Sequence, residues 1–384
     1  MKEELILEFC KKSECNIIFT DKISLLDSEE LNKNFKVVNV SVLENYLVSL
    51  ELKDSNEVKN SKIIIPTSGT SGKPKLLYHN FQSLSRTIKK QNNKENFSWG
   101  LLYGLTKFAG LQVLLQSFLT CNELSLLDLS RPLKENINIL IKNNCNCLSA
   151  TPTMFRKLLM YSNFCKLNLK QITLGGEIVD QQILNFLRNT FPEANITHIY
   201  ASTEAGVGFS IKDCKEGFPV NLLKNESNSL NLRISKENHL LIKNNNIKDK
   251  EYTYVNKDLL KINNEGYFDT GDKVKIVKDR VIFLGRANGT INVGGNKVQP
   301  EEIERIIINH PEVMATSVSG RKNSITGEIV FAKIVIKDIS MQKEVKKQII
   351  SQFKKMDIEP YKIPGILKVV NEIETNDSGK AVRS

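Results

Sequence analysis

Short apolar runs and longer amphipathic runs take turns along residues 62–200, and this alternation restricts the possible folds more than any other feature. The short runs have the length of strands and lie at 62–66, 100–105, 123–128, 147–150, 171–174 and 195–200. The longer runs have helical spacing and lie at 81–90, 110–119, 133–142, 153–160 and 181–189. Strands and helices in this order predict βαβ units, and therefore a largely parallel sheet covered by helices on both faces.

The pattern changes after Gly206, where hairpin-like strands such as 272–277 and 280–284 follow one another. This part predicts an antiparallel sheet or barrel that packs on the first sheet. A glycine-rich stretch comes next, at 285–297, and beyond it Pro300 begins a helix with acidic residues in its first turn. Two strands, a second helix and a last strand complete a small α+β unit.

The chain has 384 residues, which is more than one hydrophobic core of roughly 250–300 residues accommodates. The glycine-rich stretch is the expected boundary. The sequence therefore predicts an α/β fold with two domains. Residues 1–286 would form a large domain with a parallel and an antiparallel sheet, and residues 287–384 a small, mobile α+β domain.

Composition narrows the choice of partners and compartment. The formal net charge is +11, but the lysines are spread along the whole chain, so we expect small anions such as nucleotides as ligands and no nucleic acid. No apolar run approaches the roughly 20 residues that cross a bilayer, and the amino terminus lacks the pattern of a signal peptide. The seven cysteines are scattered without paired CxxC motifs, which predicts reduced thiols in the cytoplasm.

The segment IIIPTSGTSGKPK, residues 63–75, is the first motif that indicates chemistry. A strand ends there in a loop of small hydroxyls and glycines, whose backbone can approach phosphate oxygens closely. The loop is not a P-loop, since the spacing GxxxxGK is absent and Pro74 follows Lys73. The candidate phosphate-binding residues are Thr67, Ser68, Gly69, Thr70, Ser71, Gly72 and Lys75.

Four more segments place polar residues where a nucleotide could bind. The sequence YASTE, residues 200–204, ends a predicted strand, and open α/β sheets bind ligands at that edge. The sequence GYFDTGD, residues 266–272, puts a carboxylate after a tight turn. A long glycine-rich motif follows at 285–304, and the chain closes with NDSGKAVR at 376–383.

Together, in this order, the five motifs resemble those of the acyl-adenylate-forming superfamily, which comprises acyl- and aryl-CoA ligases, peptide-synthetase adenylation domains and firefly luciferase. The resemblance extends from residue 63 to residue 383 and therefore covers most of the chain. It implies that the loop at 68–72 holds pyrophosphate. It also implies that Thr203 contacts the α-phosphate and that Glu204 holds a magnesium ion.

The later motifs carry further roles by the same resemblance. Asp272 would bind the ribose, and Arg286 the ribose or the phosphates. Asn288 stands at the pivot of the small domain, where many members have Asp. Gly295 would line the path of the thiol, and Lys380 would reach into the site for adenylation.

A weaker match concerns the nucleotide base. The segment that ends in Gly175, Gly176 and Glu177 resembles the strand end beside the adenine, where two glycines let the base lie against the backbone. Tyr200 completes the set of predicted nucleotide-binding residues.

The resemblance implies an enzyme that joins a carboxylic acid to AMP and passes the acyl group to a thiol, with ATP, Mg²⁺ and coenzyme A as the expected cofactors. One alternative acceptor is the phosphopantetheine of an acyl carrier protein. An alternative of another class is a nucleotide-binding regulatory protein that has lost the chemistry. The segment before residue 63 and the stretch 206–266 are short for the family. The resemblance therefore predicts the fold more firmly than it predicts efficient catalysis.

The acid itself is only partly indicated. The segment YGLTKFAG, residues 103–110, lacks the Asp by which amino-acid-activating domains bind an ammonium group. Phe108 is the residue expected to shape the acyl pocket. Lys107 would pair with a second carboxylate, as in an o-succinylbenzoate-like acid, or lie solvated at the surface.

Overall fold

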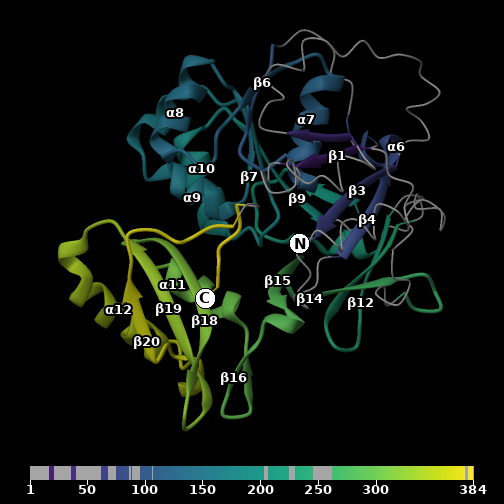
Figure 1. The fold of residues 1–384 in the computed structure, drawn as a ribbon. Coiled ribbons are helices and arrows are strands. Elements are labelled where there is room, and N and C mark those ends of the chain that lie inside the picture. The colour runs from purple at the N-terminus through teal and green to yellow at the C-terminus, as the bar shows by residue number, and fades with distance from the viewer. Residues whose placement is uncertain are drawn as a thin grey trace.

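The computed structural model describes residues 17–20, 36–39, 62–67, 75–85, 88, 96–105, 107–202, 206–224, 230–244, 262–376 and 379–383. In this part of the chain the central sheet has the strand order β10-β9-β8-β7-β5-β6 (Figure 1). Its strands are β5 (Ser98–Leu101), β6 (Glu123–Leu126), β7 (Cys147–Ala150), β8 (Gln171–Gly175), β9 (Asn195–Ser202) and β10 (Gly206–Ile211). All neighbouring strands are parallel except β10, which pairs antiparallel with β9.

Helices cover both faces of this sheet, as the alternation predicts. The helices are α7 (Phe108–Leu119), α8 (Leu133–Lys142), α9 (Pro152–Leu159) and α10 (Gln181–Thr190). Buried residues of α8, α9 and α10 pack with Leu148 and Ile172 in one core. Val113 of α7 packs on the other face, against Trp99 and Cys147. Cys147 and Leu148 point to opposite faces because successive residues of a strand alternate.

One strand prediction is wrong in its placement. The run at 62–66 does form a strand, β3 (Lys62–Thr67), but it pairs antiparallel with β4 (Lys75–Asn80) and stands outside the parallel sheet. Helix α6 (Phe81–Ser85) follows β4 directly. A further two-stranded parallel pair joins β1 (Ile17–Thr20) and β2 (Lys36–Asn39).

The second large sheet is antiparallel, as predicted. Its strands are β11 (Phe218–Pro219), β12 (Leu230–Ile234), β13 (His239–Asn244), β14 (Phe268–Val277) and β15 (Arg280–Arg286). Phe218, Leu240 and Val274 are buried in its core. Tyr200 of β9 packs against this core, so the two sheets share a boundary.

A third sheet forms the small C-terminal unit, which we define as residues 291–383. Its strands are β16 (Ile291–Val293), β17 (Asn296–Val298), β18 (Val313–Asn323), β19 (Gly327–Ile336) and β20 (Ile366–Val369). Helices α11 (Pro300–Ile308) and α12 (Gln342–Lys355) pack on it through residues such as Ile303, Ile307, Ile349 and Phe353. Short 3-10 turns lie at Ser162–Lys166, Val220–Leu223, Ala287–Gly289, Ile339–Met341 and Pro360–Lys362. The predicted fold class is confirmed.

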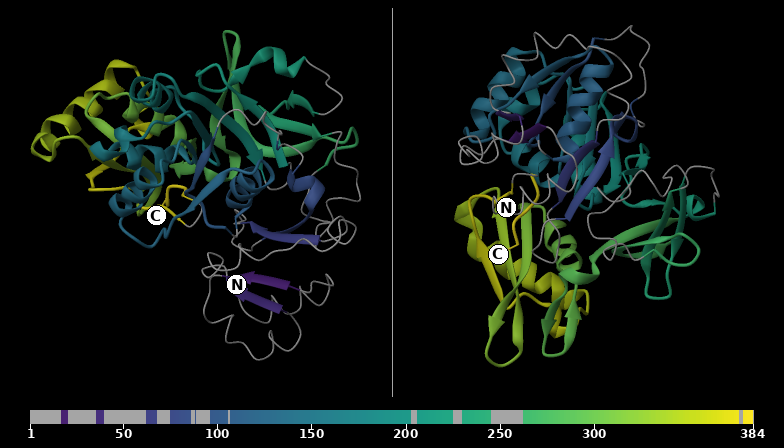
Figure 2. Two further views of the ribbon diagram at one scale, coloured as in Figure 1. Left: turned by 90° about the horizontal axis from the view of Figure 1, so that it is seen from above. Right: turned by 45° about the vertical axis from the view of Figure 1, so that its right-hand side comes forward.

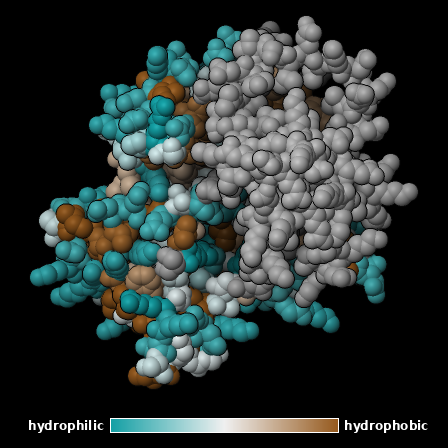
Figure 3. Space-filling model, viewed as in Figure 1, coloured by the Kyte–Doolittle hydropathy of each residue, from teal (hydrophilic) through white to brown (hydrophobic). Residues whose placement is uncertain are grey.

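The small unit lies against helices α9 and α10, and Figure 2 shows the yellow end of the chain running along the blue helices. Met160, next to α9, packs with Ala315, Val335 and Ile373 of the small unit. On the face drawn in Figure 3 the small unit is mainly hydrophilic, with isolated apolar side chains between polar ones. None of the helices in the described residues has the length and apolar character to cross a membrane.

Candidate active site

The carboxyl edge of the parallel sheet is where the chain gathers its candidate site. The strand order reverses between β5 and β7, because β6 follows β5 on one side and β7 lies on the other. Such a switch point is the usual ligand site of an open α/β sheet. Thr151 follows β7 directly, and Gly176 and Glu177 follow β8. Gly175 pairs with Ile199, so the end of β8 lies beside Tyr200.

Lys380 reaches this edge from the small unit. A Cβ atom added to Gly176 would lie 3.3 Å from Lys380 Cε, so the lysine stem runs directly over this glycine. Gly176 has a φ of +81°, a conformation that other residues rarely adopt. The main-chain N–H of Lys380 donates to Asn376 Oδ1 at 3.1 Å, and the main-chain N–H of Asn376 donates to the Lys380 carbonyl at 2.9 Å. A tight turn therefore presents the lysine to the sheet edge.

Residues on both sides of Lys380 bind to the large sheet. The buried Thr151 hydroxyl donates to the carbonyl of Gly379 and accepts from the N–H of Met154. The Glu177 carboxylate accepts from the N–H of Ala381 at 2.8 Å and from the N–H of Thr153 at 3.0 Å. Lys380 is thus fixed between two hydrogen bonds to its neighbours' main chain.

A second group of predicted residues lies on the antiparallel sheet. The Tyr200 hydroxyl donates to Asp272 Oδ2, and Arg286 Nε lies 3.1 Å from Asp272 Oδ1. Asp272 and Arg286 face each other in register on β14 and β15. The Tyr200 ring stacks between Phe209 and Phe283, with centroids 5.3 and 5.2 Å away.

The surroundings of Tyr200 determine its protonation state. Burial, followed by the Asp272 carboxylate, raises the pKa of Tyr200 well above its ordinary value of 10.0. Tyr200 therefore remains a neutral donor at physiological pH. Its hydrogen bond, together with the Arg286 guanidinium, leaves Asp272 as an oriented carboxylate with lone pairs for further donors.

Several predicted residues lie outside the described residues. They are Ser68, Gly69, Thr70, Ser71, Gly72, Thr203 and Glu204. Their roles stay predictions. The two residues that flank the predicted phosphate loop are described in their backbone, and Thr67 of β3 pairs in register with Lys75 of β4. In the described part of the chain no group of three or more His, Cys, Asp or Glu residues could hold a metal ion.

The predicted hinge and thiol path lie farther along the chain. Asn288 is part of a 3-10 turn between β15 and β16, where the chain leaves one sheet for the next. Gly294 and Gly295 connect β16 to β17 with φ angles of +59° and +88°, as a two-residue hairpin turn requires. In Figure 1 the β16 hairpin points away from α9. Gly295 lies in the turn of this hairpin, whereas Lys380 lies beside Gly176 at the sheet edge. The division at 286 and 287 and the role of Asn288 as a pivot stay predictions.

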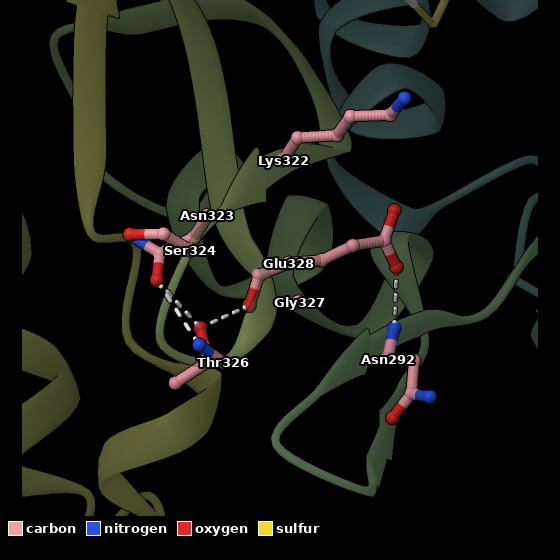
Figure 4. A pocket seen from close by; sticks show the side chains of 7 residues that line it. All are labelled: Asn292, Lys322, Asn323, Ser324, Thr326, Gly327 and Glu328. Atoms are coloured by element: carbon pink, nitrogen blue, oxygen red, sulfur yellow. Dashed lines mark hydrogen bonds between the residues drawn. The ribbon is translucent and has the colours of Figure 1, made fainter.

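A pocket of about 560 Å³ lies beside the β16 hairpin rather than at the sheet edge (Figure 4). Residues from the tip of the β18–β19 hairpin line most of it, and Asn292 completes it. The N–H of Asn292 donates to Glu328 Oε2 at 2.8 Å, which joins the two hairpins.

The predicted acyl-pocket residues stand at the start of α7. Lys107 is the N-cap, and its N–H donates to the Gly104 carbonyl at 3.0 Å. The Phe108 ring lies 5.5 Å from the ring of His79, which comes from β4 and is buried. The segment 103–110 itself contains no histidine. His79 arrives there through β4, a strand that the sequence analysis did not predict.

Thr151 is the site residue that sequence reasoning missed. A signal was present, because Thr-Pro-Thr directly after a strand is typical of a helix N-cap. That signal explains the bond to Met154 but not the bond to Gly379. Glu177 was predicted beside the adenine, whereas both of its oxygens accept main-chain N–H groups in the structure.

Two family models match this chain, one toward each end. The family model described as AMP-binding enzyme matches residues 1–228, and that of the AMP-binding enzyme C-terminal domain matches residues 302–380. A 4-hydroxybutyrate–CoA ligase of Metallosphaera sedula is 26% identical over 370 residues, which cover 87% of this chain and 64% of the relative. The chain thus spans less than two thirds of that relative's length.

Two further proteins complete the comparison. A 2-succinylbenzoate–CoA ligase of Bacillus subtilis is 23% identical over 352 residues, which cover 87% of this chain and 70% of the relative. The solved structure of an anthranilate–CoA ligase with anthranoyl-AMP shares the fold, with a TM-score of 0.75 and 17% identity over 99% of this chain and 79% of that one. The chain therefore belongs to the AMP-binding enzyme family, within the acyl-adenylate-forming superfamily that its motifs resemble.

Proposed function

We propose that the protein activates a carboxylic acid with ATP, forming an acyl-adenylate and pyrophosphate, and then transfers the acyl group to the thiol of coenzyme A. The observation that carries the proposal is the position of Lys380, held over Gly176 at the carboxyl edge of the parallel sheet. The Tyr200–Asp272–Arg286 group supports it, since β9 brings Tyr200 to the same edge. The names of the relatives, which are CoA ligases, also support it.

In the first step, an acid carboxylate and the triphosphate of ATP must approach each other although both are anions. A fixed positive charge at the point of attack lowers the barrier, because negative charge accumulates on the phosphoryl oxygens in the transition state. Lys380 would provide this charge. The Asp272 carboxylate would accept hydrogen bonds from the ribose hydroxyls, while the loop at 68–72 would donate hydrogen bonds to the leaving pyrophosphate.

Magnesium enters the proposal from the sequence motif alone, because Glu204 lies outside the described residues. Bound there, it would offset negative charge on the phosphates. Thr203 would contact the α-phosphate in the same segment. The cytoplasmic location likewise stays a prediction.

The second step needs a different surface beside the adenylate. We propose that the small unit turns about Asn288, which withdraws Lys380 and brings the Gly295 turn to the thiol. The position of Gly295 in the turn between β16 and β17, while Lys380 lies beside Gly176, supports such a turn. A carrier-protein phosphopantetheine is the alternative acceptor, and acylation of a carrier protein in preference to CoA would favour it.

For the acid, we propose a substrate with a second carboxylate, bound by Lys107 beside Phe108. The position of both residues at the start of α7, close to the carboxyl edge, supports this. A relative named for 2-succinylbenzoate, an acid with two carboxylates, supports it as well. Turnover of dicarboxylic acids should fall in Lys107→Ala while turnover of monocarboxylic acids persists. Equal turnover of dicarboxylic acids by both proteins would contradict the role of Lys107.

The deciding experiment measures acid-dependent pyrophosphate release across acyl, aryl and dicarboxylic acids, with hydroxylamine to trap the adenylate. Lys380→Ala should lose adenylate formation by about 100-fold or more and still form thioester from a supplied acyl-adenylate. Lys368→Ala, an exposed lysine of the same unit, is the matched control. Equal loss of both steps in Lys380→Ala would contradict the two-step assignment. No release with any acid would favour a nucleotide-binding protein that lacks the chemistry.

A further inference from the structure

The turn that carries Lys380 is held by two side chains of the large sheet, Thr151 and Glu177. Thr151 binds the carbonyl of the residue before Lys380, and Glu177 binds the N–H of the residue after it. Both contacts end on main-chain atoms, so they fix the path of the backbone on either side of the lysine. Gly379 packs against Thr151 at ordinary van der Waals distance, since an added Cβ would lie 3.5 Å from Thr151 Oγ1, and its φ of +70° favours glycine at this turn.

Both oxygens of the Glu177 carboxylate accept main-chain N–H groups. One oxygen accepts from Thr153 in the first turn of α9, where the helix dipole favours negative charge. The other oxygen accepts from Ala381. A carboxylate with both oxygens engaged in this way is poorly suited to contact an anionic nucleotide, which would repel it.

We propose that Thr151 and Glu177 are positioning residues that form a latch, which holds Lys380 at the sheet edge during adenylate formation and opens when the acyl group is transferred. The inference rests on the proposed function. It follows from the geometry, since the turn that carries Lys380 cannot move away from the sheet edge unless the bonds at residues 379 and 381 break. The latch acts through Lys380 and needs no contact with the substrate.

The latch predicts opposite behaviour of the two half-reactions. In Glu177→Gln one of the two carboxylate acceptors becomes an amide donor, and the bond to Ala381 or to Thr153 is lost. Adenylate formation, measured as single-turnover pyrophosphate release, should fall about 10- to 100-fold because Lys380 is misplaced. Thioester formation from a supplied acyl-adenylate and CoA should be unchanged or faster, because opening the latch is part of that step.

Thr151 offers a matched pair of variants. Thr151→Val removes the hydroxyl at nearly constant volume and should impair adenylate formation selectively, as Glu177→Gln does. Thr151→Ser keeps the hydroxyl and should restore adenylate formation to within about threefold of the wild type. Glu372→Gln is the control at the same interface, since Glu372 is a largely exposed carboxylate that pairs with Lys157. It should leave both half-reactions unchanged.

Hydrogen–deuterium exchange on the protein without substrate separates the latch from the proposed reaction. Amides in the segment 379–383 should exchange at least about tenfold faster in Glu177→Gln than in the wild type or in Glu372→Gln. Unchanged exchange in this segment would overturn the latch. Equal loss of both half-reactions in Glu177→Gln, with faster exchange throughout α9, would also overturn it, since that is the result of a structural cap alone.

The acid panel distinguishes failure of the proposed function from failure of the latch. If the wild type releases no pyrophosphate with any acid, the proposed function fails and takes the catalytic role of the latch with it. Faster exchange at 379–383 in Glu177→Gln would then still show that the contact holds the turn. If the wild type is active and the variants keep normal adenylate formation, the latch alone is overturned.

Discussion

Replacing Glu304 by glutamine should change the way in which the stability of the small C-terminal unit depends on pH. Glu304 lies on α11, and its side chain is only 18% exposed. One oxygen accepts from the N–H of Val318 at 2.8 Å, and the other lies 2.9 Å from the Arg383 guanidinium. Glu301 shares the same arginine at 2.5 Å, so two carboxylates meet one cation.

Burial raises the pKa of Glu304 from 4.5 to about 7, although the charge of Arg383 acts in the opposite direction. The folded protein therefore binds more protons than the unfolded chain between these two pH values. Stability from this group is complete below pH 4.5 and is lost as the pH rises to about 7. The difference between the pKa values of Glu304 in the unfolded and the folded protein corresponds to roughly 3 kcal/mol of unfolding free energy.

Glutamine carries no titrating proton, so the unfolding free energy of Glu304→Gln should lack this component. Between pH 4.5 and pH 8, the unfolding free energy of the wild type should fall by roughly 3 kcal/mol relative to that of the variant. Native-state hydrogen exchange of α11 and β18 peptides at several pH values measures it, with correction for the intrinsic exchange rate. Trp99 fluorescence during urea unfolding is the internal control, since the single tryptophan of the chain lies in the parallel sheet. A difference that stays constant with pH would refute the reasoning.

Three further substitutions test the packing and the nucleotide site. Gly285→Ala should lower the unfolding free energy by about 2–3 kcal/mol in urea titrations, because φ is +131° and the new Cβ would lie 2.2 Å from Glu301 Oε2; an unchanged midpoint would contradict this. Phe353→Ala should cost about 3–5 kcal/mol by the same assay, because the side chain is fully buried in the small unit; a loss below about 1 kcal/mol would count against that packing. Tyr200→Phe should raise the KM for ATP about tenfold or more by removing a hydrogen bond to the charged Asp272, and an unchanged KM would argue against Asp272 as the ribose ligand.

The alternation of strands and helices was enough to predict the parallel sheet, because each βαβ unit is a local pattern with a 2-residue or a 3.6-residue period. The same reasoning misplaced the strand at residue 62. A five-residue run such as 62–66 has the same pattern in a parallel sheet and in a hairpin, and only its partner strand decides between them. That partner, Lys75–Asn80, was not predicted as a strand, since its polar residues give no clear alternation.

The motifs predicted those site residues that lie on neighbouring strands or at the end of a strand. Asp272 and Arg286 face each other because β14 and β15 form a hairpin, and Tyr200 meets them from the end of β9. Thr151 could not be found in this way. Its partner, Gly379, is 228 positions away, and the contact ends on a carbonyl that every residue type possesses. Because a contact of this kind requires no particular side chain at the accepting residue, it cannot be recognised from the sequence.

The docking of the small unit onto the large sheet repeatedly uses such carbonyl and amide groups. Thr151 binds the Gly379 carbonyl, Glu177 the Ala381 amide, and Gln182 the Ile308 carbonyl. Side-chain substitutions on the small unit would therefore alter these contacts little, whereas changes at the three donor and acceptor side chains would alter them directly. Amino-acid sequences should therefore diverge at different rates on the two sides of this junction. Docking should leave position 308 of the small unit freer to diverge than Ala315, Val335 and Ile373, whose side chains pack with Met160.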